Sequence, residues 1–318
     1  MTQQEKGILG ISLIDDQLRI VEGRRQENEF IITGVTQGRT RQPFKFDVFS
    51  DKSMPRRFAE DITRLLGTQE FSASDVAFSL DSRMVLVKRL PVDKELQEEA
   101  LDEQVSWEVG QFAISPLDNY IVDFERLNSS AEAKVEDLLV VVVRKNVVRF
   151  LRQVFKQTDL KLKVVDVDIF SAQRALQLNY DYDAAEKIGL IDLEERKINF
   201  SILKGRNFFL AQDLQINPNN HGRDSDEATM RLITKELRRI ILDQHLGKGV
   251  EDLNEIFLYG EAVEDNVLEG LQNSYDVRIE RANPFKKVKL QGGAKEGVSG
   301  ARPERFMISV GAALRGIQ

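Results

Sequence analysis

The chain has 318 residues, of which 42% are hydrophobic and 31% are charged, and its formal net charge is −7. This length and composition are typical of a folded globular protein with room for two domains, and the negative charge argues against a surface that grips nucleic acid. The absence of cysteine excludes disulfides and thiol catalysis, and the polar N-terminus and short apolar runs predict a cytoplasmic protein without a signal peptide or membrane span.

The first predicted elements are three strands, the first two of which are joined by the acidic turn Asp15-Asp16. They are expected at 8–14, 17–22 and 29–36. The same pattern returns about 180 residues later around the acidic turn Glu194-Glu195. There the strands are expected at 188–193, 196–203 and 207–214. Two such units predict two structurally related halves.

After the first unit, the sequence predicts a helix at 53–67 and a strand at 75–80, which complete the part of the first half formed by residues 1–81. Residues 82–166 are predicted to be a small β-α-β-β-α-β subdomain inserted in this half. Its strands are expected at 83–92, 120–127, 138–144 and 161–167, and its helices at 93–112 and 146–158.

Residues 167–186 are predicted to form a linking helix and a linker, and residues 187–303 the second half with a reduced insertion. After its three strands, this half is expected to contain helices at 227–246 and 263–275 and strands at 255–259 and 276–281. The glycine-rich stretch 291–301 has only Val298 as an anchor and is predicted to be a mobile loop. The final helix, within 304–318, is expected to return to the first half. This order predicts a doubled α/β architecture.

Four stretches in this order resemble the PilM family of type IV pilus assembly proteins, which is part of the actin-like ATPase superfamily together with FtsA. They are the hairpin beginning Gly10-Ile11-Ser12, the passage 103–123 around Trp107-Glu108, the turn 192–196, and the C-terminal pieces 257–262, 283–285 and 309–316. The resemblance implies an actin-like (ribonuclease H-like) duplicated two-domain fold with a small subdomain inserted in the first half.

The same resemblance implies which residues stand at the family's nucleotide-binding positions. They are Gly10, Ser12, Ile14, Asp192, Glu194, Gly260, Glu261 and Gly311. Ile14, Glu194 and Glu261 stand where the family has glycines, and Ser12 stands where it has an acid. Carboxylates at both turns would repel phosphates by about 1 kcal/mol each in water, and by more in a cleft. We therefore expect a vestigial site without bound ATP, magnesium or catalysis.

The resemblance further implies a non-catalytic scaffold that binds the short cytoplasmic tail of a single-span, PilN-like partner, beside other pilus or secretion components. The chain would then be peripheral to the cytoplasmic face of a bacterial inner membrane. The groove for the tail is expected between the first-half sheet and the inserted subdomain, within region 83–127, with Trp107 as a candidate anchor. Two alternatives are an active actin-like ATPase with altered phosphate turns and a GspL-like cytoplasmic domain of type II secretion. The oligomeric state stays open.

Other polar residues have simpler interpretations. His221 and His245 are the only histidines, and both are expected at the surface. The pair Asp166 and Asp168 could serve as acid and base, but a helix N-cap is the expected role of Asp168.

Overall fold

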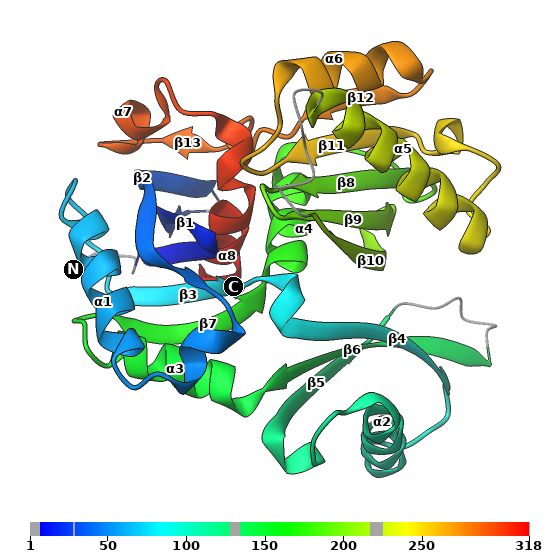
Figure 1. Cartoon of the computed structure of the whole chain (residues 1–318), viewed down its shortest axis with the longest axis horizontal. Coiled ribbons are helices and arrows are strands. Elements are labelled where there is room, and N and C mark those ends of the chain that lie inside the picture. The colour runs from blue at the N-terminus through cyan, green and yellow to red at the C-terminus, as the bar shows by residue number, and fades with distance from the viewer. Residues whose placement is uncertain (1–6, 28, 128–133, 217–224, 318) are drawn as a thin grey trace.

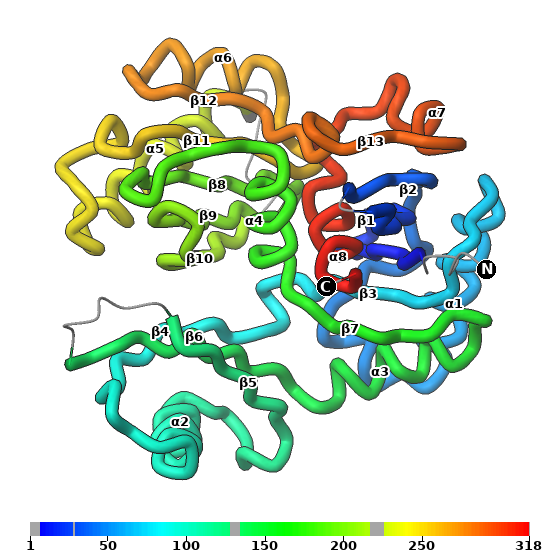
Figure 2. Tube along the Cα trace, turned by 180° about the vertical axis from the view of Figure 1, so that it is seen from behind, coloured from blue at the N-terminus to red at the C-terminus, as the bar shows by residue number. Residues whose placement is uncertain are grey.

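The computed structural model describes residues 7–27, 29–127, 134–216 and 225–317. Two five-stranded sheets lie side by side, and a smaller three-stranded sheet lies beneath them in the view of Figure 1. Two helices, α4 (Asp168–Asn179) and α8 (Met307–Ile317), pack against each other between the large sheets (Figures 1 and 2). This arrangement is the duplicated α/β architecture that the sequence predicted.

The first sheet has the strand order β13-β2-β1-β3-β7. The long element β1 takes in both strands that were predicted around Asp15-Asp16. Its first residues, from Ile8 to Ser12, run parallel to β3, and its later residues run antiparallel to β2. The backbone turns at Asp15, where φ is 51°. The strands are β1 (Ile8–Gln26), β2 (Glu29–Phe44), β3 (Asp75–Leu80), β7 (Lys161–Val167) and β13 (Lys289–Leu290).

The second sheet repeats this plan with the order β10-β9-β8-β11-β12. Here, too, an antiparallel meander is followed by parallel strands, because β8 pairs antiparallel with β9 and parallel with β11. Its strands are β8 (Lys187–Leu193), β9 (Lys197–Lys204), β10 (Asn207–Gln215), β11 (Glu255–Tyr259) and β12 (Arg278–Arg281). The three predicted strands and the acidic turn of this half are confirmed.

Each half buries its own hydrophobic core under two helices. In the first half, α1 (Met54–Leu66) and α3 (Lys145–Phe155) cover one face, where Phe44, Phe58 and Phe150 pack edge to face or tilted. In the second half, α5 (Ser225–Asp243) and α6 (Asp265–Ser274) contact one another over the matching face. No helix within the described ranges is long and apolar enough to cross a membrane.

Two of the elements predicted for the inserted unit belong to the first half instead. The element order β-α-β-β-α-β over residues 82–166 is as expected, but only its first four elements form a separate unit, with strand order β4-β6-β5. Strand β7 pairs with β3, and α3 packs in the core of the first half. The separate elements are β4 (Val85–Asp93), α2 (Glu98–Phe112), β5 (Tyr120–Arg126) and β6 (Val135–Arg144).

The stretch 291–301 is not the unpacked loop that its glycines predicted. Strand β13 extends the first sheet by pairing with β2, and the short helix α7 (Ala294–Val298) lies against the same strand. Ala294 is fully buried, so a small residue supplies the anchor that the sequence seemed to lack. The final helix α8 contacts β1 and β3 of the first half.

Candidate functional site

Lys197 is buried at the junction of the two halves, beside Asp192, one of the predicted nucleotide positions. Lys197 begins β9 just after the second acidic turn, and its side chain is 0% exposed. Its Nζ atom lies 2.7 Å from Asp168 Oδ2, 3.2 Å from Asp192 Oδ2 and 3.5 Å from Asp81 Oδ1. These three carboxylates come from the start of α4, the second half and the end of β3. The ammonium group of Lys197 therefore contacts carboxylates from both halves.

Two neighbours complete this group, which we call the Lys197 cluster: Lys197, Asp81, Ser82, Asp168, Asp192 and Asp213. The Ser82 hydroxyl lies 3.3 Å from Asp168 Oδ2 and 3.0 Å from Asp213 Oδ1, and it can donate to either carboxylate. The Asn199 amide also donates to Asp213, at 3.0 Å. Buried charges persist in proteins when they are paired and hydrogen-bonded in this way.

The ionisable groups of the Lys197 cluster differ in the direction in which their pKa values are shifted. Burial raises the pKa of Asp168 to about 7, because the Lys197 charge only partly offsets the desolvation of this carboxyl and the repulsion from its acidic neighbours. Burial alone would also raise the pKa of Asp81, but Lys197 and Arg83 lower it to about 2. Burial alone would lower the pKa of Lys197, yet the carboxylates around it hold that pKa well above its usual value. Near neutral pH, Lys197 and Asp81 are charged while Asp168 is close to half protonated.

A second buried ion pair lies beside the cluster. Arg19 on β1 is 1% exposed and forms an ion pair with Glu261, which also lies 3.1 Å from Arg305. Glu194, at an expected glycine position, is 4% exposed. Burial, together with the nearby charge of Asp192, raises the pKa of Glu194 well above its usual value. The acids that replace two family glycines, Glu194 and Glu261, are therefore held inside the protein.

The tips of the two acidic turns are also occupied by arginines of this chain. Asp15 lies 3.1 Å from Arg83, whose guanidinium also binds Asp81. Arg39 reaches both turns, at 3.1 Å from Asp16 and 3.2 Å from Glu195. Arg39 is more than half exposed, so these two pairs contribute little to stability, although they connect the halves.

The remaining predicted nucleotide positions have packing roles in the described structure. Ile14 is fully buried in the core between the halves, and Ser12 is 0% exposed with no hydrogen-bond partner for its hydroxyl among the described residues. Gly260 has a φ of 108°, and a Cβ atom there would lie 2.6 Å from Asp192 Oδ1. A side chain at Gly10 would overlap the backbone of α8 at Ser309.

Gly311 permits the close contact of α8 with α4, since a Cβ atom there would overlap the carbonyl oxygen of Ser171. We expect Gly311→Ala to lower the free energy of unfolding by about 1–3 kcal/mol through overpacking, despite the better helix propensity of alanine. Gly110→Ala is the matched control, because Gly110 is a helical glycine of α2 with nothing within 4 Å of the position of a Cβ atom. This control should keep or slightly raise stability in urea unfolding. Equal stability of the two variants would contradict the packing role of Gly311.

The region 83–127 carries an unusual number of exposed apolar side chains. Ile114 is 87% exposed, and Leu117 and Ile121 are more than a third exposed. Phe46, in the short 3₁₀ helix Phe46–Ser50 of the first half, is 45% exposed and lies under the guanidinium of Arg144, at 5.4 Å. Arg144 on β6 pairs with Tyr120 on β5, next to Ile121. Exposed apolar groups therefore gather where the first half meets the three-stranded sheet.

Trp107 does not belong to the core of the inserted unit. The helix α2 packs on its sheet through Leu101, Val105 and Val109, and Trp107 lies on the opposite side of the helix with 64% of its side chain exposed. A small cavity of about 250 Å³ lies elsewhere, between β4, β6 and β10, and is lined in part by Arg89, Lys204 and Phe209.

The other polar residues that the sequence singled out have different surroundings. Asp168 is the first residue of α4 and Val167 is its N-cap, so the expected N-cap role of Asp168 is wrong; its carboxylate binds Lys197 instead. Asp166 accepts hydrogen bonds from Ser171 and Arg174. His245 is exposed near the end of α5, and His221 lies outside the described residues. Sequence reasoning missed Lys197, Asp81, Arg19 and Asp213. The polar residues Lys197, Asn199 and Ser201 alternate with apolar residues along β9, and this pattern could have revealed a polar yet buried face.

The duplicated sheets, the helix pair between them and the turns at their junction define an actin-like ATPase fold, as comparison with solved structures shows. The chain belongs to the family of the type IV pilus assembly protein PilM, whose family model matches residues 10–216, more than half of the chain. It is similar to a solved PilM-PilN type IV pilus biogenesis complex, with a TM-score of 0.81, 18% identity and coverage of 98% of both chains.

Two further solved structures are more distant. One is a protein of unknown function with an actin-like ATPase fold from Bacteroides thetaiotaomicron, with a TM-score of 0.51, 11% identity and coverage of 95% of this chain and 98% of that one. The other is the cytoplasmic domain of EpsL, an inner-membrane component of the type II secretion system of Vibrio cholerae. It matches with a TM-score of 0.46, 10% identity and the same two coverages.

Proposed function

We propose that this chain is a non-catalytic scaffold of a type IV pilus machine and binds the cytoplasmic tail of a single-span, PilN-like inner-membrane partner. The observation that carries the non-catalytic part is the Lys197 cluster between the two halves. A phosphate-binding cleft offers free donors and positive charge. Here Lys197 is surrounded by carboxylates, and Arg19 is paired with Glu261.

A triphosphate in this position would have to compete with groups of the chain itself. A phosphate that approached Lys197 would meet the ionised, buried Asp81 beside the carboxyl groups of Asp168 and Asp192, and repulsion between charges in a medium of low dielectric constant exceeds its value in water. Displacing Lys197 would also leave these acids without their counter-charge. The active-ATPase alternative therefore requires the whole cluster to rearrange.

The partner site is supported by the exposed apolar groups where the first half meets the three-stranded sheet. Phe46, Leu117 and Ile121 offer apolar surface to a short peptide, and β5 is an edge strand of its sheet. The similar solved chain was determined in a complex with PilN, which supports a tail of that kind as the occupant. Binding such a tail would hold the chain at the cytoplasmic face of the inner membrane.

A synthetic peptide with the sequence of the cytoplasmic tail of a PilN-like, single-span protein tests the proposal. We expect saturable one-to-one binding in calorimetry, and at least about tenfold weaker binding for Ile121→Asp, because a charge then replaces apolar contact. Val135→Asp is the matched control: Val135 is 56% exposed and lies at the other end of β6 from Val143, the partner of Ile121. Absence of binding to the unaltered chain, or equal loss in both variants, would refute this site.

A further inference from the structure

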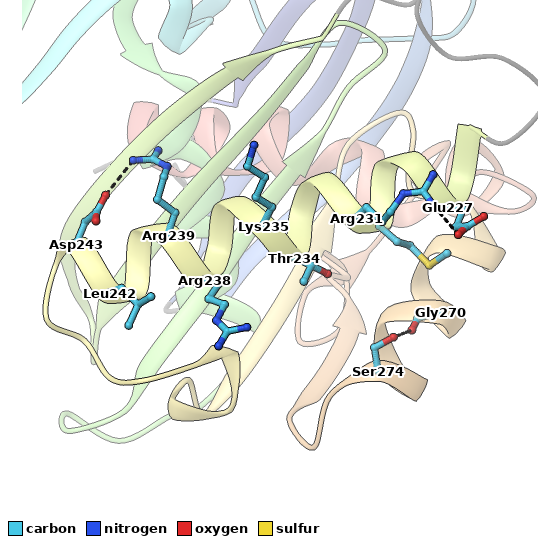
Figure 3. A pocket seen from close by; sticks show the side chains of 11 residues that line it. Glu227, Arg231, Thr234, Lys235, Arg238, Arg239, Leu242, Asp243, Gly270 and Ser274 are labelled. Carbon is cyan, nitrogen blue, oxygen red and sulfur yellow. Dashed lines mark hydrogen bonds and ion pairs between the residues drawn. The ribbon is translucent and has the colours of Figure 1, made fainter.

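The helices α5 and α6 border an open groove of about 770 Å³ on the second half (Figure 3). Met230 and Leu242 supply the apolar side chains of its lining, beside charged residues of α5. Arg238 and Leu242 of α5 extend on the side of α6, where Gly270 and Ser274 form the other wall. Leu242 is 49% exposed, which is unusual for a leucine in a helix that covers a core.

The rim of this groove carries a surplus of positive charge. Arg231, Lys235, Arg238 and Arg239 all border it, against two acids, Glu227 and Asp243. Arg231 pairs with Glu227, and Arg239 pairs with Asp243 and Glu236. Within the described part of the chain, Lys235 and Arg238 form no ion pair. The groove is thus suited to an acidic ligand that also has an apolar side chain to bury.

The outward side of α2 has this complementary character. Glu99, Asp102 and Glu103 are exposed on the first turns of the helix. Trp107 follows one turn after Glu103 on the same side and is the largest exposed apolar side chain of the described residues. Among the described residues, these three acids have no ion-pair partner, and the positions 99, 103 and 107 form one stripe along the helix.

The two surfaces cannot meet within one molecule. The three-stranded sheet has α2 on one face, while its other face packs toward β10 and α4 of the second half. The groove lies on the helical face of the second sheet, and Figures 1 and 2 show α2 and α6 at opposite ends of the molecule. Contact between them requires a second copy of the chain.

We propose that the acidic face of α2 in one copy docks into the α5–α6 groove of the next copy, with Trp107 placed against Leu242 and the carboxylates against Lys235 and Arg238. Because the two surfaces differ, the contact is head to tail and repeats, which produces a ring or an open chain of copies. Charge complementarity within the same sequence favours a second copy over nucleic acid, which would meet a protein of net charge −7.

Sedimentation velocity of the full chain over a concentration series tests this contact. We expect concentration-dependent association that weakens between about 50 mM and about 500 mM salt, as charge screening requires. Glu103→Arg and Arg238→Glu should each abolish association. A mixture of these two variants should regain association, because the intact α2 face of Arg238→Glu complements the intact groove of Glu103→Arg. The double variant should regain part of the association through the swapped charges.

Glu70→Arg and Arg149→Glu are the matched controls, since both residues are exposed and lie outside the two surfaces. They should associate like the unaltered chain. The proposal is overturned if the unaltered chain stays monomeric at low salt and high concentration, or if association survives in both Glu103→Arg and Arg238→Glu. Failure of the mixture to associate would also overturn it.

Discussion

Lys197→Met is expected to lower the free energy of unfolding by about 3–5 kcal/mol, because it leaves buried carboxylates without their counter-charge. Lys197 is 0% exposed, and Asp168 and Asp192 beside it are equally buried. Methionine keeps a flexible stem of similar length, so the change mainly removes the ammonium group. Urea unfolding of the variant beside the unaltered chain measures the loss, and circular dichroism establishes that both are folded at the start.

Two further variants separate the charge effect from lost packing. Adding Asp168→Asn to Lys197→Met removes one unpaired charge and should recover part of the stability. Lys88→Met is the surface control, because the Lys88 ammonium lies 4.0 Å from Glu108 and is largely exposed. That change should alter stability by no more than about 0.5 kcal/mol. A loss below about 1 kcal/mol for Lys197→Met would contradict the view that the cluster joins the halves.

The second large effect is a decrease in stability as the pH rises through the neutral range. The pKa of Asp168 is about 7 in the folded chain, whereas an unfolded aspartate has a pKa of about 3.9. Between these values the folded state holds a proton that the unfolded state has released, so raising the pH favours unfolding. We expect the chain to be about 1–2 kcal/mol less stable at pH 7 than at pH 5, and stability to fall further as the pH passes 7.

Asp81 affects the free energy of unfolding at acid pH. Its folded pKa of about 2 lies below the unfolded value, so its contribution is present above about pH 4 and is lost as the pH falls toward 2. Stability should therefore be greatest between these two ranges. Asp168→Asn should reduce the slope between pH 5 and pH 7, as urea midpoints across pH would show. Stability that increases with pH over this interval, in the unaltered chain, would contradict the assignment.

Local patterns were enough to predict the two halves. The apolar strands around Asp15-Asp16 and Glu194-Glu195 are short-range signals, and both turns lie where the sequence placed them. The division of residues 82–166 was harder to predict, because strand pairing is a long-range property. Nothing within Lys161–Val167 indicates that it pairs with Asp75–Leu80 of the first sheet rather than with β4 or β6.

The sequence did not reveal the Lys197 cluster. The sequence placed altered turns at the junction and indicated that acids replace glycines. It could not show that Asp81 and Lys197 are buried against each other, because the two residues are 116 positions apart in the chain. Lys197 also follows Glu194, Glu195 and Arg196, so it resembled one more charge of an exposed turn. Its place at the start of β9, an interior strand of the second sheet, rather than its residue type, determines that it is buried.

The most direct test of the scaffold account is the melting temperature of the chain with Mg-ATP in one series and with the partner tail peptide in another. A ligand present at about 100 times its Kd stabilises the folded state by about 2.7 kcal/mol. We predict a saturable increase with the tail peptide and no change with millimolar Mg-ATP. An increase with Mg-ATP, together with none from the tail, would contradict the account and favour a working nucleotide site.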